Sequence, residues 1–219
     1  MGYAEVAEEL AAEPPEVPEF LAAIYAEATA MLQVVNDLLD AAKLGASGIA
    51  IEMQEVSGGD AIQDVVDRLT PLATQKGLSL SAVASVDSPC WADPVRLRQV
   101  LTNLVANAIK YSETGQIEAR ATGSDGMCCI EVTDQGVGIA EEELDSIFEA
   151  FDSGSSGAGR RDSSGLGLAI SRCLVEAMDG ELTVYSTGPG QGSTFRLCLQ
   201  AAGGQQPESR RASLATVAD

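Results

Sequence analysis

The sequence predicts an α+β fold, in which helices and paired strands share one hydrophobic core. Apolar residues recur at spacings of three and four in several stretches, as they do in amphipathic helices. Elsewhere, short alternating stretches come in pairs around turn residues, as they do in β-hairpins. The chain has 219 residues, 45% of them apolar, which is enough for one domain with its own core and a smaller additional part.

The N-terminal part is predicted to be a long helix after a flexible lead-in. Residues 1–16 are acidic and rich in alanine, and we expect them to be loosely ordered. From Val17 to Ala42, apolar residues recur every three or four positions over more than three heptads, and Gly45 then ends the helix. This seam favours residues 17–46 as part of an intermolecular helical bundle, with a helix packed on its own domain as the alternative.

Residues 47–200 are predicted to form a second unit, and residues 201–219 a flexible tail rich in Gly, Gln and Ser. Within the unit, Asp93 before Pro94 reads as an N-cap followed by a first-turn proline, which fixes the start of a helix. The predicted elements are, in order, a strand at Ile49, Ile51 and Met53, a helix over 60–76, a strand over 78–86, a helix over 93–112, a hairpin of 116–122 and 127–133, a helix over 165–178, and a hairpin of 181–187 and 192–199.

The composition excludes several classes of site. The 33 acidic and 13 basic residues give a net charge of -20, so a nucleic-acid surface, which needs a positive footprint, is not expected. The chain contains no histidine, which removes imidazole acid–base chemistry, Ser-His and Cys-His nucleophile pairs, and His-containing metal sites. A phosphate ligand would have to be held by a local positive cluster.

Cysteine usage and hydropathy indicate a soluble cytoplasmic segment. Five cysteines, two of them adjacent at Cys128 and Cys129, fit a reducing compartment better than a disulfide framework, and we expect most of them to be small core residues. An organelle stroma is the other compartment compatible with this usage. No apolar run approaches 18 residues, and the acidic N-terminus lacks the order of a secretion signal, so no membrane contact by this segment is expected.

The helix over 93–112 has two different sides. Two amides four residues apart are costly on a half-buried helix, because each brings a polar group that must find a partner. The polar side either bonds to neighbouring loops or is free for a ligand, and the helix alone leaves both possibilities open. Leu97, Leu101, Leu104 and Ala108 lie on the apolar side, whereas Asn103, Asn107 and Lys110 gather on another side with Tyr111 at its edge.

The strand that ends at Asp134 leads into the sequence DQGVGI. Glycines at alternate positions, Gly136 and Gly138, let the backbone approach a flat ligand closely, because glycine tolerates positive φ and has no side chain in the way. Asp134 could then accept a hydrogen bond from an exocyclic amine. The alternative is an ordinary strand-to-helix turn without a ligand.

A polar, glycine-rich stretch over residues 152–164 separates this turn from the next helix, and it is predicted to be a mobile lid. The following sequence GLGLAIS opens a helix with glycines, which present free N–H groups and the positive end of the helix dipole to phosphates. Arg160 and Arg161 supply positive charge just before it. The alternative for this arginine pair is a solvated loop.

Five motifs occur in a fixed order over residues 93–199: NLVANAIKY, DQGVGI, IFEAF, GLGLAIS and GSTF. They resemble the N box, first Gly box, F box, second Gly box and closing strand of the catalytic domain of sensor histidine kinases. Residues 17–44 are similar to the second helix of the dimerisation domain that precedes it. The resemblance covers most of the chain and implies a two-layer α/β sandwich, with one mixed sheet and helices on one face, behind a long helix.

The resemblance also implies a site for ATP and Mg²⁺. Asn107 would bind Mg²⁺ through its side-chain oxygen, and Asp134 would hold the adenine amino group, with Ser193 or Thr194 assisting through water. The remaining residues would surround these. Asn103, Lys110 and Tyr111 would lie near the metal and the phosphates, Gly136, Gly138 and Ile139 would shape the adenine pocket, Phe148 and Phe151 would anchor the lid, Gly165, Leu166, Gly167 and Leu168 would cradle the phosphates, and Arg160 or Arg161 would close over them.

The function implied is transfer of the ATP γ-phosphoryl group to a histidine that this chain lacks, and onward to the receiver domain of a response regulator. The long helix would make the protein a homodimer. ATP-hydrolysing relatives such as gyrase have a Glu in place of Asn103, so that a carboxylate can take a proton from the attacking water. Because an amide cannot, bound ATP is better suited to phosphoryl transfer to a positioned side chain.

The missing histidine leaves alternatives open. The chain is either the catalytic part of a longer kinase, which we favour, or a nucleotide-binding module that signals through its helical bundle without phosphotransfer. A Ser-directed kinase or an ATPase of the wider superfamily is a third hypothesis. The heptad helix and Asn103 argue against this third hypothesis.

Overall fold

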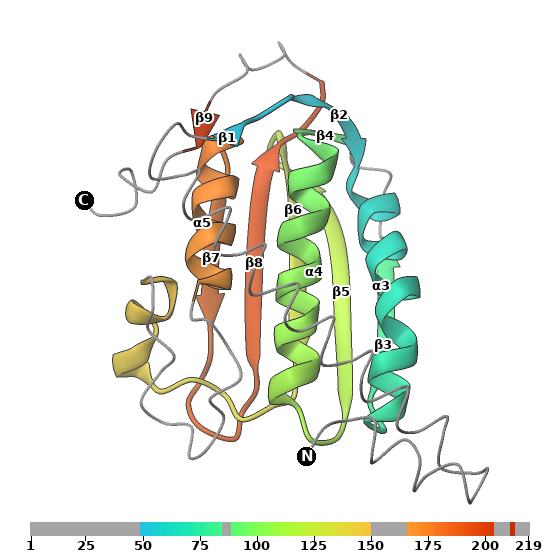
Figure 1. The fold of residues 1–219 in the computed structure, drawn as a ribbon, viewed down its shortest axis with the longest axis vertical. Helices are drawn as coiled ribbons and strands as arrows, with labels where there is room; N and C mark the ends of the chain where they lie inside the picture. The colour runs from blue at the N-terminus through green and yellow to red at the C-terminus, as the bar shows by residue number, and fades with distance from the viewer. Residues whose placement is uncertain (1–48, 85–88, 150–165, 204–210, 213–219) are drawn as a thin grey trace, which may run out of the picture.

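The computed structural model describes residues 49–84, 89–149, 166–203 and 211–212. In these ranges the chain forms two layers, a five-stranded sheet and three helices on one of its faces, which confirms the predicted mixed sheet with helices on one face (Figure 1). The predicted lead-in and long helix lie outside the described residues. The helices are α3 (Gly58–Gln75), α4 (Pro94–Tyr111) and α5 (Gly167–Ala177), and the strands in their order across the sheet are β3 (Ser79–Ala84), β5 (Gln116–Ser124), β6 (Met127–Asp134), β8 (Ser193–Gln200) and β7 (Glu181–Tyr185).

The sheet is mixed because its first pair is parallel. β3 pairs in parallel with β5, and α4 lies in the stretch of chain that connects them. Every other neighbouring pair in the sheet is antiparallel. The hairpin of β5 and β6 turns at Asp125 and Gly126, which both have positive φ, as a two-residue turn of the primed type requires. Both predicted hairpins are therefore confirmed, and β8 lies between β6 and β7.

The core lies between the sheet and the helices. Along β6 and β8, alternate side chains such as Ile130 and Leu197 are buried against the helix layer. α4 lies between α3 and α5 in Figure 1 and buries its predicted apolar side, including Leu97 and Leu104, each 0% exposed. No helix in the described part of the chain is long and apolar enough to cross a membrane.

Two small sheets were not predicted from the sequence. Of the strand predicted at Ile49, Ile51 and Met53, only β1 (Ile49–Ala50) forms, and it pairs with β9 (Arg211–Ala212). A second strand, β2 (Gln54–Ser57), begins just after the predicted one and pairs with β4 (Pro89–Ala92). In the predicted flexible tail, the structure places β9, and backbone hydrogen bonds hold Ala201 and Ala202 to the carbonyls of Gly126 and Pro89. These contacts could not be predicted from composition, because backbone hydrogen bonds do not depend on which side chains the segment carries.

The cysteine prediction is correct for three residues and wrong for two. Cys90, Cys128 and Cys173 lie outside the disulfide and are buried, as expected of small core residues. Cys129 and Cys198, however, lie opposite one another on β6 and β8 and form a disulfide. Their separation of 69 residues hides this pairing from the sequence, since only the strand register brings them together.

Asp93 caps α4 as predicted. Its Oδ1 accepts hydrogen bonds from the backbone N–H groups of Val95 at 2.9 Å and Arg96 at 3.2 Å, which have no acceptor within the helix. Its Oδ2 accepts from the N–H of Glu52 at 3.0 Å. One buried carboxylate therefore ties the segment between β1 and β2 to the start of the central helix.

Lys76 stabilises the opposite end of α4. Its Nζ donates to the backbone carbonyls of Ile109 at 2.6 Å, Lys110 at 2.9 Å and Ser112 at 3.3 Å, where the helix dipole is negative. We expect Lys76→Met to lower the free energy of unfolding by about 1–3 kcal/mol, because three carbonyls lose their cation and two of them belong to the buried residues Ile109 and Ser112. Urea denaturation measures this.

The matched control is Arg68→Met, which removes an exposed pair with Asp64 within α3 and should change stability by less than about 0.5 kcal/mol. Equal urea midpoints for the two variants would show that Lys76 does not act as a helix cap.

Candidate functional site

Asp134 ends β6 directly opposite Ser193, the first residue of β8. Its Oδ1 accepts from the backbone N–H groups of Gly136 at 2.7 Å and Ser193 at 3.3 Å, and its Oδ2 accepts from the Ser193 hydroxyl at 2.5 Å. The side chain is only 6% exposed. A carboxylate offers about four lone-pair sites, and three are occupied, so this fixed group retains capacity for one further donor.

The loop after Asp134 packs against the end of α4. The N–H of Val137 donates to the carbonyl of Tyr111 at 3.1 Å. A Cβ at position 136 would lie 2.5 Å from that same oxygen and 2.9 Å from Oδ1 of Asp134, so only glycine fits there. The glycine predicted to allow close approach to a ligand therefore also allows the loop to approach the helix.

The loop between β7 and β8 closes over the Asp134 loop. Ser186 links the two, because its hydroxyl donates to the carbonyl of Gly192 at 2.7 Å and accepts from the N–H of Ile139 at 3.0 Å. The N–H of Gly192 also donates to the carbonyl of Gly136 at 3.2 Å. Ser186 was not predicted to belong to the site, because it fell in the strand predicted over 181–187, and its one signal in the sequence was its place just before a glycine-rich loop.

A pocket of about 330 Å³ lies at this end of the sheet. Its walls include Asp134, Ser193 and Thr194 from the two central strands, together with Leu144 and residues of the β7–β8 loop. The residues predicted to shape the adenine pocket, Gly136, Gly138 and Ile139, are not among its walls. Neither predicted amide of α4 is among its walls. The lining residues are Thr133, Asp134, Leu144, Val184, Tyr185, Ser186, Thr187, Gln191, Gly192, Ser193 and Thr194.

The two amides of α4 differ in their partners. Nδ2 of Asn103 donates to the hydroxyl of Ser171 on α5 at 2.9 Å, and a Cβ at Gly167 would lie 2.6 Å from its Oδ1. Asn107 is half-buried and lies one turn further along the helix, and its side chain makes no hydrogen bond to the described residues. Both alternatives left open by the sequence thus occur: Asn103 bonds to a neighbouring element, and Asn107 remains available to a ligand.

Residues 92–203 match the family described as histidine kinase-, DNA gyrase B-, and HSP90-like ATPase. The chain belongs to this ATPase family. It is 37% identical over 194 residues to the sensor protein GacS of Pseudomonas syringae pv. syringae, and 33% identical over 200 residues to the sensor histidine kinase RcsC of Escherichia coli strain K12. These alignments cover 85% and 90% of this chain but 21% of each relative, so the chain spans about a fifth of their length.

Solved structures give the same assignment. Full-length ShkA, crystallised in complex with AMPPNP, superposes with a TM-score of 0.70 at 31% identity, covering 91% of this chain and 40% of ShkA. The histidine kinase AdeS of Acinetobacter baumannii shares the fold, with a TM-score of 0.68 at 21% identity and 87% of each chain covered. The resemblance read from the five motifs is confirmed, and the domain is the ATP-binding catalytic domain of the sensor histidine kinase type.

In this ATPase-family domain, the start of α5 carries the second glycine motif. Gly167 is its first residue, and the N-cap position is occupied by Leu166, whose apolar side chain cannot accept from the N–H groups of the first turn. The Leu166 side chain is 3% exposed and lies in the core, so only its backbone could contact a phosphate, while Leu168 packs partly buried against that core. At the end of α4, Nζ of Lys110 lies 5.5 Å from the centre of the Tyr111 ring.

The base of the predicted lid is anchored in the core. Phe148 ends the short helix η2 (Ser146–Phe148), is 5% exposed, and packs edge to face on Phe195 with ring centroids 6.4 Å apart. The Arg172 guanidinium of α5 lies over the Phe148 ring, 5.5 Å from its centre. Four predicted residues of the lid and of the phosphate cradle, Phe151, Arg160, Arg161 and Gly165, lie outside the described residues.

Proposed function

We propose that this chain is the catalytic portion of a sensor histidine kinase, which donates the ATP γ-phosphoryl group to a histidine outside this chain. The observation that carries the proposal is the buried carboxylate of Asp134, held by three hydrogen bonds, beside a pocket of about 330 Å³ and with capacity for one more donor. The amino group of adenine is such a donor. The relatives called sensor kinases support the same assignment.

Asn107 fits a role in binding Mg²⁺. The described residues contain no cluster of three Cys, Asp or Glu side chains that could hold a metal ion, so phosphate oxygens would supply most ligands. Mg²⁺ takes oxygen ligands and commonly shares one or two protein groups with a nucleotide, and the unpartnered amide of Asn107 offers one such oxygen. When bound, the ion would neutralise charge on the phosphates during transfer.

The same helix disfavours hydrolysis. The residue at position 103 is an asparagine and not a glutamate, and its amide is hydrogen-bonded to Ser171. An amide cannot take a proton from the attacking water. The remaining route is transfer to a positioned acceptor. No histidine occurs among the 219 residues, so the acceptor belongs to another polypeptide or segment. Homodimerisation through residues 17–46 and transfer to a response-regulator receiver domain complete the proposal.

Labelling with [γ-³²P]ATP tests the transfer step. The chain alone should remain unlabelled, and a dimerisation segment that carries a histidine, added as a separate polypeptide, should become labelled through an acid-labile bond. Label on this chain alone would contradict the proposal. Binding of ATP without label on any supplied histidine segment that is verified as dimeric would instead favour a nucleotide-binding module without phosphotransfer.

Asn107→Ala should weaken binding of ATP about tenfold or more in the presence of Mg²⁺ and much less in its absence, because the lost oxygen is a metal ligand. Its free energy of unfolding should stay within about 0.5 kcal/mol of the parent, since Asn107 has no hydrogen bond to the described residues. Titration calorimetry with and without Mg²⁺ measures both affinities.

The comparison variant is Asn103→Ala, which removes the bond to Ser171 and should lower stability by about 1 kcal/mol. If adding Mg²⁺ raises the ATP affinity of Asn107→Ala by the same factor as it does in the parent, Asn107 is not the metal ligand.

A further inference from the structure

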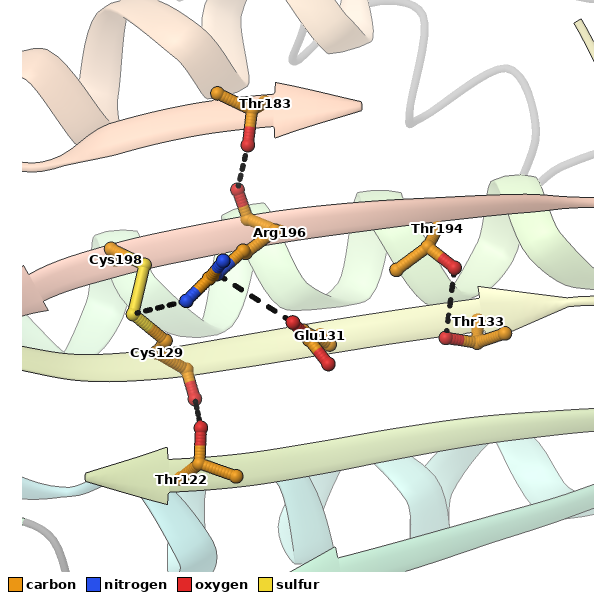
Figure 2. Close-up of polar contacts among 8 residues, drawn as sticks. All are labelled: Thr122, Cys129, Glu131, Thr133, Thr183, Thr194, Arg196 and Cys198. Atoms are coloured by element: carbon orange, nitrogen blue, oxygen red, sulfur yellow. Dashed lines mark hydrogen bonds and ion pairs between the residues drawn. A yellow bond between two sulfur atoms is a disulfide. The ribbon is translucent and has the colours of Figure 1, made fainter. Parts of the chain in front are cut away.

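A second site lies on the face of the sheet away from the helices. Cys129 of β6 and Cys198 of β8 are directly paired in the strand register, with Cα atoms 4.1 Å apart, and their sulfur atoms are bonded (Figure 2). Cys129 is 8% exposed, whereas Cys198 is half-buried and so is the more accessible sulfur. Neither cysteine lines the pocket at Asp134.

The sheet does not need this bond to hold the two strands together. β6 and β8 are already paired along their whole length, from Met127 opposite Gln200 to Asp134 opposite Ser193. Side chains that face each other at close positions of an antiparallel pair have Cα atoms about 4.5 Å apart without any bond. The fold therefore accommodates two thiols at this position as well as a disulfide.

A positive charge lies next to one of the sulfur atoms. Nη2 of Arg196 lies 3.7 Å from Sγ of Cys129, and Nε of Arg196 lies 3.5 Å from a carboxylate oxygen of Glu131 (Figure 2). Glu131 holds the guanidinium over the strand, and the guanidinium stabilises a thiolate on Cys129 more than on Cys198. The less accessible sulfur is thus the better leaving group.

We propose that Cys129 and Cys198 form a reversible dithiol–disulfide site that exchanges with small thiols, such as glutathione, with Arg196 stabilising the Cys129 thiolate. A small thiolate attacks Sγ of Cys198, the bond between the two cysteines breaks, and Cys129 leaves as a thiolate that takes a proton from water. A second small thiolate attacks the mixed disulfide and releases Cys198. Two small thiols are oxidised to one disulfide, and the protein pair gains two electrons and two protons.

Two other cysteines provide a contrast. Cys90 on β4 and Cys128 on β6 are both buried in the hydrophobic core, at 0% and 1% exposure. Hydrogen bonding to Cys128 and burial raise the pKa of the Cys90 thiol, whereas the same hydrogen bond lowers the pKa of Cys128. Both sulfur atoms belong to residues that are at most 1% exposed, so small thiols cannot reach them in the folded protein. Exchange should therefore be confined to the pair on the open face, although Cys128 is adjacent to Cys129 in sequence.

The test equilibrates the full chain in glutathione buffers of increasing oxidised fraction, blocks free thiols, and maps linked peptides by mass spectrometry. We expect one linkage, between Cys129 and Cys198, that forms and is reduced while the far-ultraviolet circular dichroism stays native. Cys128→Ala and Cys173→Ala should keep this linkage, and Cys198→Ala should abolish it. Five free thiols in fully oxidised buffer, a linkage to a different cysteine, or a bond reduced only after unfolding would each overturn the proposal.

The role of Arg196 is tested by the rate of reduction of the folded protein by dithiothreitol. Arg196→Gln should slow reduction roughly threefold to tenfold, because Cys129 becomes a poorer leaving group. Arg98→Gln is the control, since Arg98 pairs with Asp64 in the helix layer, on the other side of the sheet, and should leave the rate unchanged. Equal rates for the two variants would overturn the assigned role of Arg196.

Discussion

Asp134→Asn should weaken the binding of adenine nucleotides about 100-fold while the domain stays folded. Both backbone donors, the N–H groups of Gly136 and Ser193, point at the same carboxylate oxygen, Oδ1. An asparagine can keep its carbonyl oxygen at the Oδ1 position and turn its amide nitrogen toward the Ser193 hydroxyl. That hydroxyl, a donor to Asp134, would then become the acceptor. The variant then presents a donor where the adenine amino group needs an acceptor, and a hydrogen bond to a charged group is worth about 1.5–3 kcal/mol.

Titration calorimetry with ADP and GDP measures this effect and its base specificity. Guanine carries a carbonyl where adenine carries the amino group, so the preference for ADP over GDP should largely disappear in Asp134→Asn. Glu131→Gln is a control on the same strand, because that side chain lies on the opposite face of the sheet and pairs with Arg196. If Asp134→Asn binds ADP as the parent does, the carboxylate does not recognise the base.

Gly192→Ala should lower the free energy of unfolding by about 3 kcal/mol and abolish nucleotide binding. Gly192 has a φ of +71°, and a Cβ there would approach the carbonyl oxygen of Asp134 much closer than the 3.0 Å that real Cβ atoms respect. That oxygen belongs to the backbone of the central strand, so relief requires the β7–β8 loop to move away from the pocket. Urea denaturation and ADP titration measure the two effects.

Gly190→Ala separates steric overlap from backbone strain. Gly190 lies in the same loop with a similar φ of +77°, but a Cβ there has nothing within 4 Å. Only the cost of a left-handed conformation remains, about 1 kcal/mol, and binding should persist. Similar losses of stability for the two variants would show that contact with Asp134 is unimportant.

Local signals allowed most of the fold to be predicted. The N-cap at Asp93, the turn at Asp125 and Gly126, and the apolar spacing of α4 each act within a few residues, and each is confirmed. The strand β4 was missed because Pro89 and its neighbours carry no alternation, and their partner is β2, some 35 residues earlier in the chain. Pairing between distant segments is not encoded in either segment alone.

The residues of the site also differ in whether a local sequence pattern or long-range packing determines their role. Asp134 could be found because a carboxylate at a strand end before alternate glycines is a local pattern. The structure places it opposite Ser193 with a direct hydrogen bond between them, and their part in holding adenine stays a prediction. The different roles of Asn103 and Asn107 could not be predicted, because they depend on whether α5 brings a partner such as Ser171 to each amide. The helix has the same pattern at both positions, and only packing distinguishes them.

The position of β8 also constrains how the domain is assembled during synthesis. This strand is the last of the five in sequence yet lies inside the sheet, between β6 and β7 (Figure 1). A growing polypeptide that has not reached residue 193 can pair the β5–β6 hairpin but has nothing to insert beside it, and Asp134 has no serine opposite it. Nucleotide binding thus cannot precede release of almost the entire domain from the ribosome, and long-range closure should make folding slow compared with helical proteins of this size.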